Sequence, residues 1–127
     1  MNYLSSEQAK EEFEKLFHNV LEKYKLIHFE SIIEKTYYEF VYKNSKNRFL
    51  MLYVEPYEFA LSLLVGDIVQ SERKNVKYLI QAMREKGADI SRVREKLKKK
   101  KFEKDEWFKD SIEREILFVE EFGDLVL

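Results

Sequence analysis

The sequence predicts a single α+β domain over residues 1–127, with one N-terminal helix, a four-stranded antiparallel meander sheet and helices in the C-terminal half. Three observations predict this class: an apolar stripe at helical spacing near the N-terminus, alternating apolar residues from residue 26 to residue 66, and helical spacing again afterwards. With 45% hydrophobic and 15% aromatic residues, the chain has enough apolar side chains for one core. No linker, repeat or low-complexity stretch divides it.

The first helix is predicted over residues 6–24. Apolar residues recur three or four positions apart along it, namely Ala9, Phe13, Leu16, Phe17, Val20, Leu21 and Tyr24. Ser5 and Gln8 have the spacing of a capping box, which places the start of the helix just after Ser5. The opposite face is charged and is interpreted as solvent-exposed.

A period of two then predicts four strands, at residues 26–33, 36–42, 48–55 and 59–65. The short polar segments between them suit hairpins, so the strands form an antiparallel meander.

The register of the central hairpin decides which side chains share a face. If residues 44–47 form its loop, Tyr42 lies opposite Phe49 and Tyr38 lies opposite Tyr53. One face is then aromatic, whereas the other is aliphatic on the last two strands and polar on the first two. Because both faces need cover, we expect a three-layer arrangement or a strongly curled sheet.

The C-terminal half is predicted to be helical. One helix begins after Ser71 and ends at Gly87, a second is capped by Ser91, and a third covers residues 105–122. The last three residues either add an edge strand or pack into the core.

No motif for catalysis, a metal or a cofactor is present. The chain has no cysteine, no HExxH, no GxSxG and no glycine-rich phosphate loop. The best catalytic candidate is a polar patch of His28, Glu30 and Glu39, because the two glutamates are expected opposite each other on neighbouring strands, where like charges raise the pKa of a carboxyl. A solvated corner of the sheet explains the same residues, so we predict that the protein is not an enzyme.

Charge is distributed in blocks although the net charge is only −1. Residues 1–72 carry 8 basic and 12 acidic groups, residues 73–104 carry 13 and 4, and residues 105–127 carry 2 and 8. Such blocks indicate that charge has a role in packing or recognition.

Three interpretations of these blocks stay open. The basic segment packs against the acidic C-terminal helix, or it binds the phosphates of a nucleic acid, or a charged block meets a complementary protein surface. Phosphate binding would use Arg92, Arg94, Lys96, Lys98, Lys99 and Lys101. The acidic surface for a protein partner would consist of Asp105, Glu106, Trp107, Asp110, Glu113, Glu120 and Glu121.

One amphipathic helix is followed by YYEFVY (residues 37–42), RFLMLYVEP (48–56) and FALSLLVG (59–66). This arrangement resembles the small bacterial α+β immunity proteins of polymorphic or contact-dependent toxin systems. The resemblance implies a cytoplasmic, non-enzymatic protein that binds one cognate toxin domain and blocks it. Many such proteins present acidic surfaces to nuclease toxins, whereas this chain is nearly balanced in charge and has a lysine run.

We therefore expect a protein-binding module of the immunity or antitoxin type, with a nucleic-acid-binding accessory protein that uses residues 73–104 as the alternative. No apolar run approaches the length of a membrane span, and no signal peptide is seen, so a cytoplasmic protein without a membrane partner is expected. Homodimerisation through an exposed sheet edge is compatible with both functions.

Overall fold

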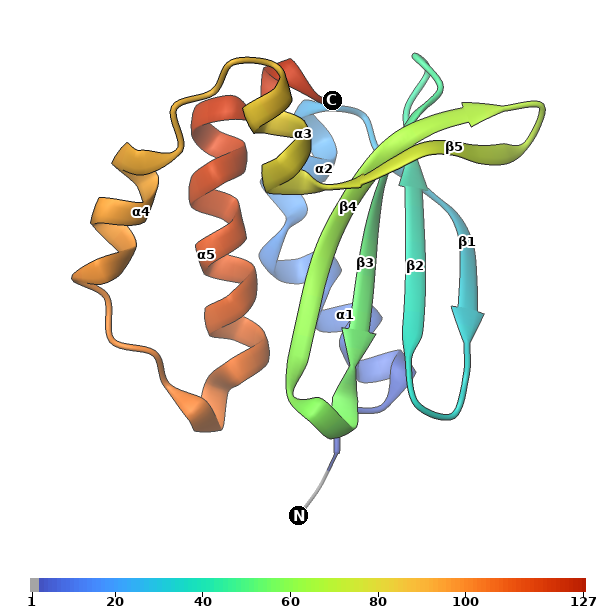
Figure 1. Cartoon of the computed structure of the whole chain (residues 1–127). Coiled ribbons are helices and arrows are strands. Elements are labelled where there is room, and N and C mark those ends of the chain that lie inside the picture. Colours follow the sequence, from blue (N-terminus) through green and yellow to red (C-terminus); the bar gives the residue numbers. More distant parts are fainter. Residues whose placement is uncertain (1–2) are drawn as a thin grey trace.

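The computed structural model describes residues 3–127, which form a five-stranded antiparallel sheet with helices packed against one of its faces (Figure 1). The strands follow chain order across the sheet: β1 (Ile27–Ile33), β2 (Tyr38–Lys43), β3 (Arg48–Glu55), β4 (Ala60–Val69) and β5 (Glu72–Tyr78). The helices are α1 (Ser6–Leu16), α2 (His18–Lys23), α3 (Leu79–Glu85), α4 (Ser91–Lys98) and α5 (Trp107–Phe122), with single 3-10 turns η1 (Pro56–Glu58), η2 (Lys104–Glu106) and η3 (Gly123–Leu125). The α+β class and the antiparallel sheet are confirmed.

The N-terminal helix begins where the capping box places it. Gln8 N–H donates to Ser5 Oγ at 3.2 Å, and Ser5 N–H donates to Gln8 Oε1 at 3.0 Å. The predicted continuous helix over residues 6–24 is interrupted at Phe17, whose φ of −96° and ψ of 8° separate α1 from α2. This break leaves the Phe17 ring buried and stacked on Phe13, with ring centroids 4.8 Å apart.

A fifth strand stands where the sequence predicts the beginning of a helix. Residue 71 does not cap a helix: Gln70 and Ser71 both have positive φ, at 53° and 66°, and form the two-residue turn that joins β4 to β5. The predicted four-stranded sheet is therefore wrong by one strand. Only the end of the predicted helix is helical, as α3.

The register of the β2–β3 hairpin differs by one residue from the prediction. Tyr42 lies opposite Leu50, not Phe49, because the loop has three residues instead of four. Asn47 adopts a left-handed backbone with φ of 60°, and Asn44 N–H donates across the loop to Arg48 O at 3.0 Å. This bulged turn shifts the pairing of β3 with β2 by one residue. Every side chain of β3 therefore faces the opposite side of the sheet from the one predicted.

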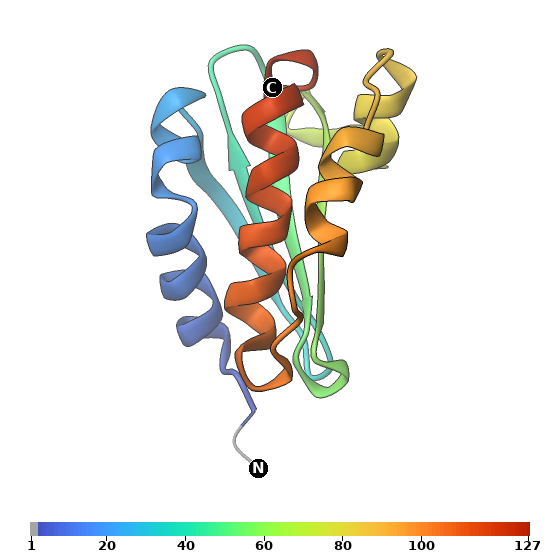
Figure 2. The ribbon, with the colours of Figure 1, turned by 90° about the vertical axis from the view of Figure 1, so that its left-hand side faces the viewer.

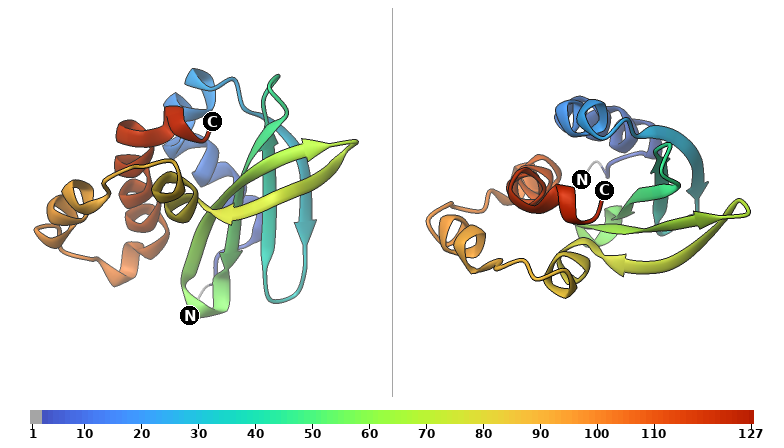
Figure 3. Two further views of the ribbon diagram at one scale, coloured as in Figure 1. Left: turned by 45° about the horizontal axis from the view of Figure 1, so that its top comes forward. Right: turned by 90° about the horizontal axis from the view of Figure 1, so that it is seen from above.

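The corrected register gives the sheet two different faces. Aromatic residues of β2 and aliphatic residues of β3 and β4 share the face that the helices cover, and this core includes Phe40, Tyr42, Leu50, Leu52, Val54, Leu63 and Val65. On the other face a smaller buried cluster consists of Val41, Phe49, Met51 and Ile68. The β4–β5 hairpin curls over this cluster, and Figure 3 shows the strong curvature of the sheet. The predicted strongly curled sheet is the arrangement found.

The remaining helices lie side by side across the covered face. Figure 2 shows α1, α5 and α4 next to one another with the sheet behind them. Val93 of α4 and Ile112 of α5 are fully buried. Asp89 Oδ1, not Ser91, accepts the hydrogen bonds at the start of α4. The C-terminal residues Val126 and Leu127 pack into the core and add no strand.

Within residues 3–127, no helix combines the length and the apolar character that crossing a bilayer requires.

Replacing Gly66 tests the close approach of β4 to the Phe49 ring and to the backbone of β5. An added Cβ would lie 2.6 Å from Phe49 Cε2 and 2.7 Å from the backbone oxygen of Lys74. We expect Gly66→Ala to lower the free energy of unfolding by about 2 kcal/mol in urea titrations, because the ring or the strand has to move. Ser62→Ala on the same strand is the control and should change this free energy by less than about 0.5 kcal/mol. Equal losses for the two variants would contradict the close approach.

Candidate functional site

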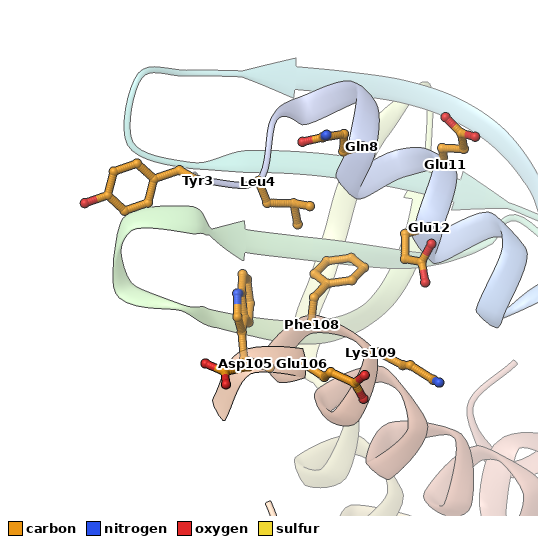
Figure 4. Close-up of a pocket in the computed structure, with 10 residues that line it drawn as sticks. Tyr3, Leu4, Gln8, Glu11, Glu12, Asp105, Glu106, Phe108 and Lys109 are labelled. Atoms are coloured by element: carbon orange, nitrogen blue, oxygen red, sulfur yellow. The ribbon is translucent and has the colours of Figure 1, made fainter. Parts of the chain in front are cut away.

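A cleft between α1 and the beginning of α5 is the main candidate site (Figure 4). Its volume is about 630 Å³, and it is lined by Tyr3, Leu4, Gln8, Glu11, Glu12, Asp105, Glu106, Trp107, Phe108 and Lys109. Figure 4 shows Leu4 and Phe108 pointing toward the space between the two helices. A cleft of this size accommodates a ligand group or a few residues of a peptide.

Four carboxylates from two helical segments lie at this cleft. Glu11 and Glu12 come from α1, and Asp105 and Glu106 come from the turn before α5. Within residues 3–127 none of the four forms an ion pair, and Lys109 is the only basic residue among those that line the cleft. The cleft therefore has an unneutralised negative charge that attracts cationic groups.

A row of aromatic rings continues from the cleft onto the neighbouring surface. The ring centroids are separated by 4.6 Å for Tyr57 and Tyr3, 6.0 Å for Tyr3 and Phe59, 6.0 Å for Phe59 and Trp107, and 5.5 Å for Trp107 and Phe108. Tyr3 is 47% exposed and Tyr57 is 49% exposed, so ring faces remain accessible to a partner. We call these five residues the aromatic row.

The backbone at Phe59 is strained in a way that places its ring in this row. Phe59 has φ of 52° and ψ of 43°, a left-handed conformation that is unfavourable for a bulky residue. The conformation ends the η1 turn and positions the ring between Tyr3 and Trp107. Strain of this kind, of the order of 1 kcal/mol, is often found at functional sites.

The structure brings three of the seven predicted acidic-surface residues to the cleft: Asp105, Glu106 and Trp107. The other four lie elsewhere on α5. Asp110 is buried and accepts from Arg114 Nε at 2.6 Å, while Glu121 lies 3.7 Å from Lys96 Nζ. Glu120 lines a separate groove between α1–α2 and α5, and Glu113 is half-buried on the same helix.

Sequence reasoning missed the contribution of the N-terminal segment to the cleft. Glu11 belongs to the face interpreted as merely solvated, and Tyr3, Glu12 and Phe59 carry no motif. A weak signal exists, since Glu11-Glu12 within the first amphipathic helix and Asp105-Glu106 just before the last one are both acidic pairs. That signal identifies a site only once the two helices are known to be neighbours.

The predicted basic residues lie on α4 and the segment after it. Arg92, Arg94, Lys96, Lys98, Lys99 and Lys101 are all exposed. Lys96 pairs with Glu121 of α5 at 3.7 Å, and Lys98 pairs with Glu95 of its own helix at 3.0 Å. Within the described part of the chain, Arg92, Arg94, Lys99 and Lys101 form no ion pair, so α5 neutralises little of the basic segment.

The polar patch of His28, Glu30 and Glu39 is divided between the two faces of the sheet. Glu30 lies opposite Val41 and Glu39 lies opposite Ile32, so the two glutamates are diagonal neighbours and not a direct pair as predicted. A bulge between His28 and Glu30 puts His28 on the other face, beside Tyr42. The glutamates are offset because the β1–β2 loop has four residues, 34–37, and not two, so that Ile33 pairs with Tyr38. His28 changes face because the bulge inserts one residue into β1.

Arg73 of β5 joins the two glutamates. Its guanidinium lies 3.4 Å from Glu30 Oε1 and 3.1 Å from Glu39 Oε1, and its Nη1 also contacts Met51 Sδ at 2.9 Å. The side chains of Arg73 and Glu39 are only 25% and 17% exposed. This ion-pair network fixes the β4–β5 hairpin over the sheet, and it accounts for the two acidic residues structurally.

The Glu115 carboxyl of α5 is buried without a complete set of hydrogen-bond partners among the described residues. Burial raises the pKa of Glu115 to about 7, and among residues 3–127 its buried Oε2 has no hydrogen-bond partner. A carboxyl with this pKa is suited to acid–base chemistry. Because the unpaired oxygen is inaccessible to solvent, we interpret Glu115 as a cost to stability rather than a catalytic group.

No protein-family model, curated protein or solved structure matches this chain.

The Arg73 network predicts a loss of stability when one carboxylate is neutralised. Glu39→Gln removes the closer ion pair of Arg73 while keeping the shape of the side chain, and we expect the free energy of unfolding to fall by about 1 kcal/mol in urea titrations. Glu34→Gln, an exposed residue at the end of β1, is the control and should have an effect within about 0.5 kcal/mol of zero. If Glu39→Gln matches this control, the network does not hold the hairpin.

The raised pKa of Glu115 predicts that replacing this residue by glutamine stabilises the protein by an amount that depends on pH. The pKa of Glu115 is about 7 in the folded protein and near 4.5 in an unfolded chain. Well below pH 4.5 the carboxyl is neutral in both states, so its ionisation has no effect on stability. As the pH rises from 4.5 toward 7, the carboxyl ionises in the unfolded chain first, so the free energy of unfolding falls. We expect Glu115→Gln to raise the free energy of unfolding by an amount that is larger at pH 8 than at pH 4.5, with a difference on the order of 2 kcal/mol. Denaturation of both proteins at each pH measures it. A gain independent of pH would show that the carboxyl is not perturbed.

Proposed function

We propose that this protein is a non-enzymatic protein-binding module of the immunity type, which neutralises a cognate toxin by direct binding. The observation that carries the proposal is the cleft between α1 and α5, where four unpaired carboxylates adjoin the aromatic row. Tryptophan and tyrosine are the residue types that most often dominate the binding energy of protein interfaces. Unneutralised charge around them accelerates the encounter with an oppositely charged partner.

The second candidate function is nucleic-acid binding through the basic segment at residues 73–104. The observation that favours it is the exposure of Arg92, Arg94, Lys99 and Lys101 without ion-pair partners in the described chain. Phosphate contacts made by such residues weaken steeply with salt. Within the same segment, only Phe102 and Tyr78 offer an exposed aromatic ring for stacking, which makes this the weaker candidate.

Capture from the native lysate with matched variants tests the proposal. Tagged wild-type protein, treated with nuclease and washed at moderately high salt, is expected to retain one stoichiometric protein. The cleft variant Glu12→Gln/Trp107→Ala should retain at least tenfold less of it, because charge and the aromatic anchor are both removed. Circular dichroism shows whether this variant is folded.

The control carries Lys98→Glu, Lys99→Glu and Lys101→Glu on the basic segment. Unchanged capture by this control, together with loss by the cleft variant, supports the protein-binding proposal. If instead the lysine substitutions abolish binding, and the bound material is nucleic acid that disappears with nuclease or salt, the second function is correct. Retention of the protein partner by the cleft variant would overturn the role of the cleft.

A further inference from the structure

We propose that the cleft between α1 and α5 receives an arginine side chain of the partner, with its guanidinium between carboxylates of the two helical segments and against the aromatic row. This inference rests on the proposed function, since it names the chemical group that the same cleft recognises. It is carried by three features: unpaired carboxylates on both sides, accessible ring faces, and an arginine site of the same kind elsewhere in this protein.

The carboxylates stand on opposite sides of the cleft. Glu12 belongs to α1, whereas Asp105 and Glu106 precede α5, and Figure 4 shows Glu12 pointing toward the α5 side. A planar guanidinium has five donors and forms hydrogen bonds with acceptors in several directions at once. A lysine ammonium is also attracted to ring faces, as Lys43 Nζ is to the Phe29 ring at 4.9 Å, but it is a compact, strongly hydrated point charge without a planar fork of donors. Carboxylates on both sides of the cleft therefore favour arginine.

The aromatic row supplies the second contact that a guanidinium uses. Trp107 and Phe59 are half-buried, with ring centroids 6.0 Å apart, and Trp107 itself lines the cleft. A guanidinium placed over the face of a tryptophan is attracted by the ring, more strongly when solvent is partly excluded. The left-handed backbone at Phe59 holds the neighbouring ring in place, so little ordering is needed when the ligand arrives.

The protein contains an arginine in these same surroundings. The guanidinium of Arg114 lies 5.5 Å from the ring centroid of Phe102, and its Nε donates to Asp110 at 2.6 Å. Its Nη2 also donates to the Lys100 carbonyl at 3.1 Å, so a carboxylate, an aromatic ring and one backbone oxygen together hold this arginine. The cleft presents more carboxylates and more rings than this internal site, and it presents them to another molecule.

Fluorescence of Trp107 measures binding directly, because it is the only tryptophan in the chain. The full-length protein is titrated with three acetylated, amidated peptides, Gly-Ser-X-Ser-Gly, in which X is arginine, lysine or citrulline. Citrulline keeps the shape of arginine and removes its charge. Concentrations reach about 10 mM, because a single cationic side chain is expected to bind in the millimolar range.

The arginine peptide is expected to change the fluorescence with saturation, to bind at least threefold more tightly than the lysine peptide, and to bind at least tenfold more tightly than the citrulline peptide. The variant Glu12→Gln/Asp105→Asn should lose most of the preference for arginine over citrulline. Glu120→Gln, which lies on α5 outside the cleft, is the matched control and should keep it.

Equal binding of the three peptides, or no saturable change with any of them, would overturn the inference. So would equal binding of arginine and lysine, which would show that the cleft responds to charge alone. These failures are distinct from failure of the proposed function. If cleft-dependent capture of a protein persists without a preference for arginine, only this inference falls. If arginine is preferred but no protein is captured through the cleft, the proposed function falls and the ligand chemistry stands.

Discussion

The left-handed backbone at Asn47 is the constraint on which the arrangement of the sheet depends. By shortening the loop to three residues it sets Tyr42 opposite Leu50, and because side chains alternate between faces, it decides which face of β3 is buried under the helices. Asn44 supports this turn: its Oδ1 accepts from the backbone N–H of Arg48 at 3.2 Å, and its Nδ2 donates to the Leu127 carbonyl at 3.2 Å. The same side chain therefore joins the hairpin to the end of the chain, directly after α5.

The orientation of α1 and α5 on the covered face explains why negative charge accumulates at one end of the molecule. The two helices run in the same direction, and their N-terminal ends lie at the same end of the molecule (Figures 1 and 2). The cleft lies between α1 and the beginning of α5. A helix dipole is favourable for carboxylates near the N-terminus, so Asp105 and Glu106 are stabilised without a cationic side chain. Glu11 and Glu12 lie further along α1, where this effect is weaker. The fold can thus keep acidic groups unpaired at a surface where a partner can reach them.

Local rules predicted the parts of this fold that depend on neighbouring residues. The capping box, the first four strands and the end of α5 follow from spacing and turn residues. The register of the β2–β3 hairpin did not follow from the sequence, because the same residues are compatible with a three-residue loop and with a four-residue loop. Only the left-handed backbone at Asn47 distinguishes the two loops. The fifth strand was missed because the Gln70-Ser71 turn contains neither glycine nor asparagine. For the cleft, Trp107 was predicted as a binding residue but Glu12 was not, since only the packing of α1 against α5 brings the two residues to one cleft.

The separation of charge also bears on how selective the cleft is. The lysine run ends shortly before Asp105, and the backbone of Lys100 is held against α5 by a hydrogen bond from Arg114 Nη2 to its carbonyl at 3.1 Å. If the proposed partner were strongly basic, the cleft would attract it and the lysines that precede Asp105 in the chain would repel it. Only a partner that presents a cation to the cleft, and neutral or acidic groups to the lysines, satisfies both surfaces. Opposite charges placed side by side in this way select for the orientation of a partner as well as for its charge.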